Sequence, residues 1–146
     1  MDTSAPPVNG SAVLAALLER SGIEYRRQCE RFRFVFAQNN RKWQTVCDCR
    51  AGLVLVYGIY PSGICDTSSA LTVCNELNRQ VVRGGFFVQD RHFIFRTGAD
   101  LFELCDASET VARALEYNAS AISGFWPELS AATAEDTLFV PRTASL

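Results

Sequence analysis

The sequence predicts an α+β fold in which helices pack on an antiparallel sheet. Five stretches carry strand patterns, and turn residues rather than helical crossovers separate most of them. Three other stretches repeat apolar residues at helical spacing. The 146 residues are the size of one domain, without an internal repeat or a long linker. The predicted order of elements is therefore α-β-β-β-α-β-β-α, in a single domain over residues 11–130.

The first helix is predicted to follow a short lead-in. Residues 1–10 contain proline and glycine and few apolar groups, so we expect them to be disordered. Asn9 or Ser11 can cap the helix, and Gly22 is a stop signal. Its apolar stripe consists of Val13, Leu14, Leu17 and Leu18.

Three strands are predicted next. In residues 31–36 three phenylalanines alternate with other side chains, two of them arginine, so this strand has one buried face. Residues 43–50 form the second strand. The third, residues 53–60, is apolar on both sides, and we therefore expect both of its faces to be covered.

The second half of the chain adds two helices around a hairpin. A helix begins near Asp66 and stops at Gly84-Gly85, and the hairpin turns at Asp90-Arg91. The last helix starts after Asp106 and ends near Pro127. Its stripe consists of Val111, Leu115, Ala119, Ile122 and Trp126. The residues predicted for the core are Phe32, Phe34, Phe36, Leu55, Leu77, Leu115 and Trp126.

Composition predicts a cytoplasmic protein without a membrane span. The net charge is −2, no apolar run approaches the roughly 20 residues that a span needs, and residues 1–10 do not resemble a secretory signal. In a reducing compartment the six cysteines are expected to be thiols. Basic side chains gather in residues 20–50 and acidic ones in residues 99–136.

The sequence contains no recognisable catalytic, cofactor or metal motif. Cys47 and Cys49 share one strand face, but a structural zinc site needs a second pair of ligands. His92 is the only histidine, and no nucleophile elbow accompanies it. Gly84-Gly85 follows a predicted helix rather than preceding one, which is the wrong order for a phosphate loop. We expect no catalytic residues, no cofactor and no metal.

Nucleic acid is a disfavoured partner. Arg31 and Arg33 share a strand face with further basic residues nearby, as in some nucleic-acid platforms. Such platforms also need exposed aromatic rings. Here the alternation turns Phe32 and Phe34 toward the predicted core, away from the arginines.

Four short phrases occur in a recognisable order over nearly all of residues 11–130. They are Leu18 with residues 21–25, residues 74–78, residues 85–88, and Ala114-Leu115 through residues 125–129. In this order they resemble the YbjN family, whose architecture is shared with type III secretion chaperones. The six cysteines and the segment Leu138-Phe139-Val140 are departures from the pattern. The resemblance implies a non-catalytic, dimeric domain with a regulatory or chaperone-like role.

These observations predict a protein-binding module that acts as a homodimer. A second subunit is the simplest cover for a central strand that is apolar on both faces. The alternatives are a small-ligand-binding domain or enzyme with a cysteine-lined cavity, and nucleic-acid binding through the basic strand face. The candidate protein-binding residues lie on the central strand and in the tail, residues 131–146. They are Leu53, Leu55, Tyr57, Ile59, Leu138, Phe139 and Val140.

Overall fold

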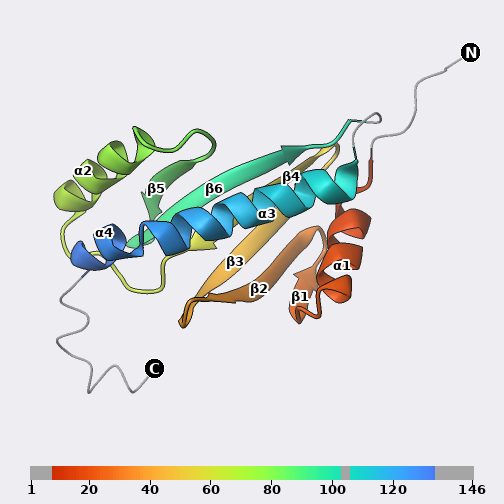
Figure 1. Ribbon diagram of the computed structural model, residues 1–146, viewed down its shortest axis with the longest axis horizontal. Coiled ribbons are helices and arrows are strands. Elements are labelled where there is room, and N and C mark those ends of the chain that lie inside the picture. Colours follow the sequence, from red (N-terminus) through yellow and green to blue (C-terminus); the bar gives the residue numbers. More distant parts are fainter. Residues whose placement is uncertain (1–7, 103–105, 134–146) are drawn as a thin grey trace, which may run out of the picture.

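The computed structural model describes residues 8–102 and 106–133, which form one antiparallel sheet with helices (Figure 1). The sheet has six strands in the order β1-β2-β3-β4-β6-β5. This confirms the predicted α+β class and adds β1 and α4 to the predicted elements. In chain order the elements are α1 (Gly10–Arg20), β1 (Tyr25–Gln28), β2 (Arg31–Gln38), β3 (Arg41–Arg50), β4 (Leu53–Ile59), α2 (Thr67–Asn78), β5 (Gly85–Gln89), β6 (His92–Asp100), α3 (Ala107–Gly124) and α4 (Trp126–Ala131).

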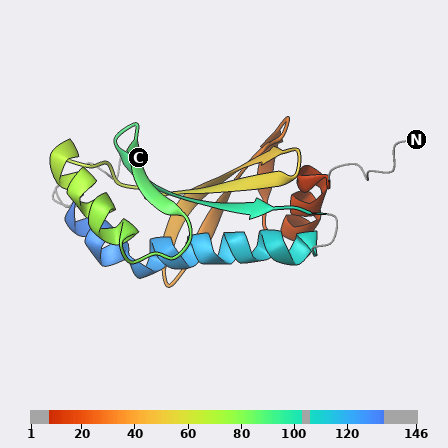
Figure 2. The ribbon, with the colours of Figure 1, turned by 90° about the horizontal axis from the view of Figure 1, so that it is seen from above.

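The helices lie on one side of the sheet. Figure 2 shows α3 running along that side, with α1 near one end and α2 near the other. We call this side the covered face and the opposite side the open face. The core lies between the covered face and the helices, in two clusters that both contact the half-buried Phe36. Within the described residues no helix has the length and apolar character that a membrane crossing requires.

Two of the hairpins turn through pairs of residues with positive φ. Asn39 and Asn40 have φ of 54° and 63°, and Asp90 and Arg91 have 52° and 65°. Positive φ at both central residues is the backbone of a two-residue hairpin turn that matches the twist of the strands. The turn predicted at Asp90-Arg91 is therefore confirmed.

The first strand, β1, was not predicted because its sequence carries no alternation. Tyr25 is half-buried and the next three residues, Arg-Arg-Gln, are exposed. Its connection to β2 turns at Cys29, which has a φ of 57°. Cysteine is not a typical residue for a left-handed turn, so the turn was hidden as well.

The last predicted helix breaks at Phe125, and its two parts are α3 and α4. Pro127 has no N–H to donate to the carbonyl of Ser123, four residues earlier. The guanidinium of Arg41 donates to that carbonyl instead, at 2.7 Å, and stacks over the ring of Trp126 at 5.3 Å. The prediction that Trp126 continues the stripe of α3 was wrong for this reason.

Helix α2 ends at Asn78, before the predicted stop at Gly84-Gly85. The side chain of Asn78 accepts a hydrogen bond from the N–H of Phe86 at 2.7 Å and donates to its carbonyl at 3.0 Å. These two bonds tie the helix end to the start of β5. The hydroxyl of Tyr117 accepts from the N–H groups of Val82 and Arg83 in the connection.

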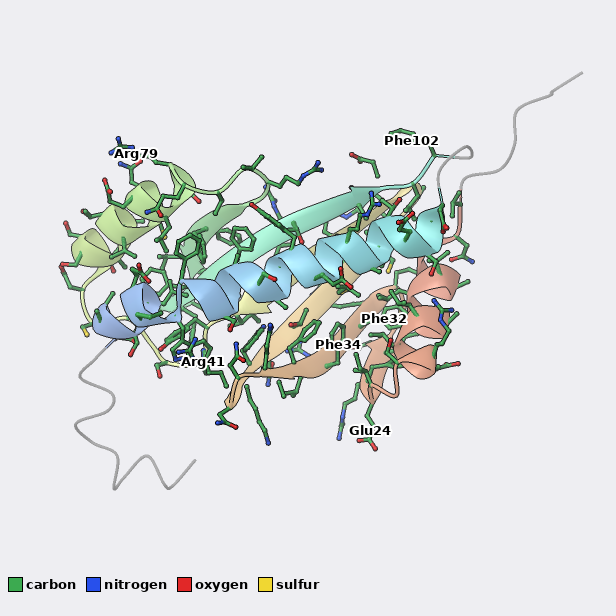
Figure 3. The ribbon with its side chains drawn as sticks, viewed as in Figure 1. Glu24, Phe32, Phe34, Arg41, Arg79 and Phe102 are labelled. Carbon is green, nitrogen blue, oxygen red and sulfur yellow. The ribbon has the colours of Figure 1, made fainter. Side chains whose placement is uncertain are left out.

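Most of the predicted core is confirmed. Phe32, Phe34, Leu77 and Leu115 are buried, and Figure 3 shows the two phenylalanines on the covered face near α1 and α3. Phe36 and Trp126 are partly buried against the core clusters. Leu55 was wrongly predicted for the core: it lies on the open face and is partly exposed. Strand β4 buries its alternate residues, from Val54 to Gly58.

Candidate protein-binding surfaces

The open face carries a continuous apolar strip over four neighbouring strands. In the pairing register Val46 of β3 lies opposite Tyr57, Ile59 lies opposite Ile94 of β6, and Ile94 lies opposite Phe87 of β5. The rings of Tyr57 and Phe87 meet edge to face, with centroids 6.5 Å apart. We call this set the apolar strip: Val46, Leu53, Leu55, Tyr57, Ile59, Phe87 and Ile94. All of them except the buried Ile94 are partly exposed.

The structure brings together the four candidate residues on the central strand. Leu53, Leu55, Tyr57 and Ile59 form one row of β4 in the middle of the apolar strip. We expected both faces of this strand to be covered. Within the described residues the helices cover only one face, the one that carries the buried residues of β4. Leu138, Phe139 and Val140, the other three candidates, lie outside the described residues.

Charged side chains flank the apolar strip toward β2. Asp48 lies between two arginines, 3.0 Å from Arg50 and 4.0 Å from Arg31. Arg33 donates a hydrogen bond to the side chain of Gln44 at 3.2 Å. Among the described residues neither Arg33 nor Arg26, its neighbour across β1, forms an ion pair. The open face is thus basic toward β1, and Arg96 of β6 adds an exposed cation opposite Tyr57.

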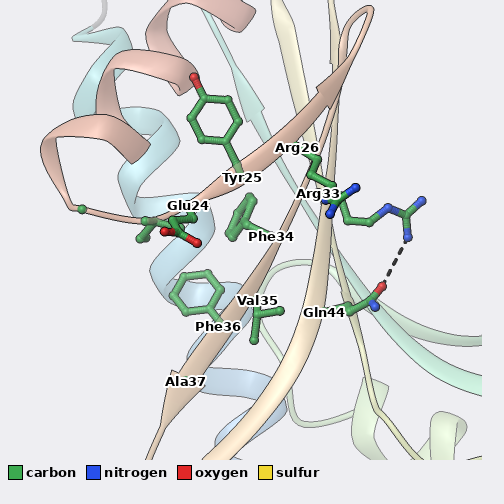
Figure 4. A pocket seen from close by; sticks show the side chains of 11 residues that line it. Glu24, Tyr25, Arg26, Arg33, Phe34, Val35, Phe36, Ala37 and Gln44 are labelled. Carbon is green, nitrogen blue, oxygen red and sulfur yellow. Dashed lines mark hydrogen bonds between the residues drawn. The ribbon is translucent and has the colours of Figure 1, made fainter. Parts of the chain in front are cut away.

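A second feature is an opening of about 1000 Å³ beside β2, where β1 is too short to cover its neighbour (Figure 4). Tyr25, the first residue of β1, pairs with Phe34, so the last four residues of β2 have no strand partner on that side within residues 8–102 and 106–133. We call this space the edge opening. Its walls come from the turn after α1, from β1 and from β2, with Gln44 of β3. They consist of residues 22–26, residues 33–37 and Gln44.

One wall of the edge opening is fixed by a hydrogen bond. The hydroxyl of Tyr25 donates to the carboxylate of Glu19 in α1 at 2.7 Å, and this bond raises the pKa of Tyr25. The edge opening was not predicted, because β1 itself was not. The surplus of basic residues between 20 and 50 was its only sequence signal, and that surplus does not reveal where β2 loses its partner.

The cysteines of the sheet face the core. Cys47 and Cys49 share one face of β3, as their spacing predicted; it is the covered face, where 0% and 5% of their surface is exposed. Burial raises the pKa of both thiols and raises that of Cys74 to about 11. Cys49 contributes to a hollow of about 400 Å³ beside Ser11 and Glu30, whose side chains hydrogen bond to each other.

These shifts predict which thiols are labelled in the folded protein. Iodoacetamide reacts with thiolates, which a raised pKa makes scarce at neutral pH. At pH 8 we expect the exposed Cys29 to be alkylated while Cys47, Cys49 and Cys74 stay unmodified until urea unfolds the chain. Peptide mapping by mass spectrometry gives the modified positions. Rapid native alkylation of Cys47 would contradict this placement and restore the hypothesis of a reactive cysteine.

The remaining chemical candidates have simple structural roles. The Nδ1 of His92 lies 2.9 Å from the carbonyl of Asp90, within its own hairpin. Across residues 8–102 and 106–133, no three histidine, cysteine or acidic side chains come close enough together to hold a metal. Arg31 and Arg33 are exposed on the open face, opposite the buried Phe32 and Phe34. The predicted separation of arginines from aromatic rings on β2 is therefore confirmed.

Comparison with known proteins identifies the fold. No protein-family model matches the sequence, and no curated protein matches it. The crystal structure of YbjN from E. coli, a proposed transcription regulator, is similar with a TM-score of 0.62. The chain has a YbjN-like fold. The similarity covers 87% of this chain and 96% of that chain at 16% sequence identity, so it shows shared architecture and leaves function to be argued from the surface.

Proposed function

We propose that this chain is a non-enzymatic protein-binding module, regulatory or chaperone-like, that acts as a homodimer through the open face. The observation that carries the proposal is the apolar strip on β4 and its neighbours, which no helix of the described residues covers. Contiguous exposed apolar surface on a sheet is typical of interaction sites. The YbjN-like fold supports the regulatory part, because YbjN is described as a proposed transcription regulator.

The apolar character of the strip favours a second copy of the chain as its partner. A two-fold interface uses the same patch on both subunits, so an apolar centre meets an apolar centre. Arg26, Arg31 and Arg33 lie on the β1 and β2 side of the strip, so an antiparallel arrangement of the two sheets keeps these two regions apart. The buried thiols of Cys47 and Cys49 fit a reducing compartment, which supports the proposal of a cytoplasmic location.

The dimer predicts a specific response to charge. A lysine at Leu55 would be desolvated in the middle of the interface, so Leu55→Lys is expected to convert the dimer into a monomer. Sedimentation velocity at high micromolar concentration should give about twice 16.2 kDa for the unaltered chain and about 16.2 kDa for the variant. Thermal melts followed by circular dichroism verify that the variant is folded.

The matched control places the same substitution outside the apolar strip. Leu71 of α2 is 54% exposed, and Leu71→Lys should leave the dimer intact. A monomer mass for the unaltered chain at high micromolar concentration would refute the homodimer. Equal loss of the dimer in both leucine variants would locate the interface elsewhere.

A further inference from the structure

We propose that the edge opening binds the C-terminal segment of this chain, residues 134–146, as an added strand on the free edge of β2. This surface is distinct from the apolar strip, so the inference goes beyond the homodimer. Three properties of the opening select the occupant. Within the described residues it has main-chain groups without a strand partner, an apolar wall, and two arginines without ion pairs.

The unpaired main-chain groups follow from the hairpin between β2 and β3. Because Asn39 and Asn40 form a two-residue turn, the flanking Gln38 and Arg41 are a hydrogen-bonded pair. Alternate residues of a strand direct their N–H and C=O groups to opposite sides. Those of Val35 and Ala37 therefore point away from β3, at positions beyond the end of β1. Two donors and two acceptors are available to an added strand.

The two walls of the opening differ in chemistry. On the covered face an added strand meets apolar side chains, Phe34, Phe36 and Tyr25, with Ile23 beside them. On the open face it meets Arg33, Arg26 and the 54% exposed Val35, and Glu24, the one acidic residue among the described residues of the lining, directly precedes β1. Figure 4 shows Val35 and the arginines apart from the aromatic rings. The matching occupant is an extended segment with acidic groups followed by apolar ones.

Residues 134–146 have this composition. Glu135 and Asp136 precede Leu138-Phe139-Val140, and Pro141 then ends any strand, because it has no N–H to donate. With Asp136, Leu138 and Val140 on one side, Glu135 and Phe139 are on the other. Glu135 can thus point toward the open face, where Arg33 and Arg26 lie, while Leu138 points toward the aromatic wall of the covered face.

The segment also starts within reach of the opening. Phe36 stacks on Trp43 with centroids 5.9 Å apart, and Trp43 contacts Trp126 at 5.9 Å, where α4 begins. Helix α4 has six residues, which span about 9 Å. Val140 lies seven residues beyond Thr133, the last described residue, and seven extended residues span about 24 Å.

A second copy of β2 is a poorer occupant of the same edge. Pairing two β2 edges would bring Arg33 and Arg26 of each chain toward the same basic residues of the other. Like charges that face each other across a strand pair are destabilising. The arginines therefore favour an acidic strand over a second basic one.

Peptide binding to a truncated chain tests the proposal. A fluorescent peptide of residues 134–146 should bind the chain of residues 1–133, and its anisotropy should rise with protein concentration. The full chain should bind the peptide at least roughly tenfold more weakly, because its own segment competes at a high effective concentration. Circular dichroism must show that residues 1–133 remain folded, and the described core, which ends at Thr133, is retained in that chain.

A charge exchange locates the site. Arg33→Glu in residues 1–133 should weaken the peptide about tenfold, and a peptide with Glu135→Arg should regain most of that loss. The matched control is Arg83→Glu, at the other place where a strand runs past a shorter edge strand: β6 extends past β5, and Arg83 lies beside Thr97 of β6. This control should leave the affinity unchanged.

Main-chain methylation tests for a strand. Alternate N–H groups of a strand face the partner edge, so only one of the two neighbours Leu138 and Phe139 donates to β2. N-methylation at that position should abolish binding, and N-methylation at the other should have little effect. Absence of binding at high micromolar concentration would overturn the proposal. A loss of peptide affinity in Arg83→Glu but not in Arg33→Glu would also overturn it. Dimers of residues 1–133 that Arg33→Glu dissociates would assign the edge to a second copy instead.

Discussion

Truncation of Phe32 to alanine is expected to lower the free energy of unfolding by about 3–5 kcal/mol, the usual cost of removing a buried phenylalanine ring. Phe32 has 0% of its surface exposed, and its ring lies 5.3 Å from that of Tyr25. It belongs to the cluster that joins β2 to α1 and α3. Loss of the ring leaves a cavity between the sheet and both helices. Urea unfolding followed by circular dichroism measures the change.

The control for this cavity is an exposed apolar residue. Leu71→Ala in α2 removes a side chain that is 54% exposed, and surface truncations of this kind change stability by about 0.5 kcal/mol or less. A Phe32→Ala variant as stable as Leu71→Ala would mean that β2 does not bury this face.

Replacement of Asn118 by alanine is expected to lower stability by about 2–4 kcal/mol, because it removes the buried hydrogen bonds of the amide and leaves a cavity between α3 and the sheet. Asn118 is 1% exposed in α3. Its amide donates to the carbonyls of Val56 at 3.1 Å and Phe95 at 2.9 Å, on the neighbouring strands β4 and β6. Gly58 makes room for it, since a Cβ there would collide with the amide oxygen.

Ser120→Ala on the exposed side of the same helix serves as the reference and should leave stability nearly unchanged. The comparison separates the loss of the amide from a change in helix propensity. If Asn118→Ala unfolds at the same urea concentration as Ser120→Ala, the carbonyls of Val56 and Phe95 do not depend on this side chain.

Local patterns predicted the elements that depend on neighbouring residues in the sequence. The alternation in residues 31–36 placed Phe32 and Phe34 on one face and the arginines on the other. The Asp90-Arg91 turn was predicted because a two-residue connection between two strands allows few backbone geometries. Asp106 was predicted as a cap, and its carboxylate accepts from the N–H of Glu109 at 3.1 Å.

Long-range contacts produced the errors. The break before α4 depends on Arg41, more than 80 residues away, which bonds the carbonyl that Pro127 leaves without a donor. The early end of α2 depends on hydrogen bonds between Asn78 and β5. Neither partner is recognisable from the local sequence, because each is identified only when the sheet is assembled.

The sequence by itself determined the fold class, the identity of the buried face of β2 and the apolar character of β4, because residue spacing alone decides which side chains share a face. The tertiary structure decided which face of β4 the helices cover, and thus that Leu55 lies on the open face and not in the core. It also decided that β1 stops opposite Phe34 and leaves the edge of β2 open. Both features depend on where distant elements end relative to one another, and a one-dimensional pattern contains no such distance.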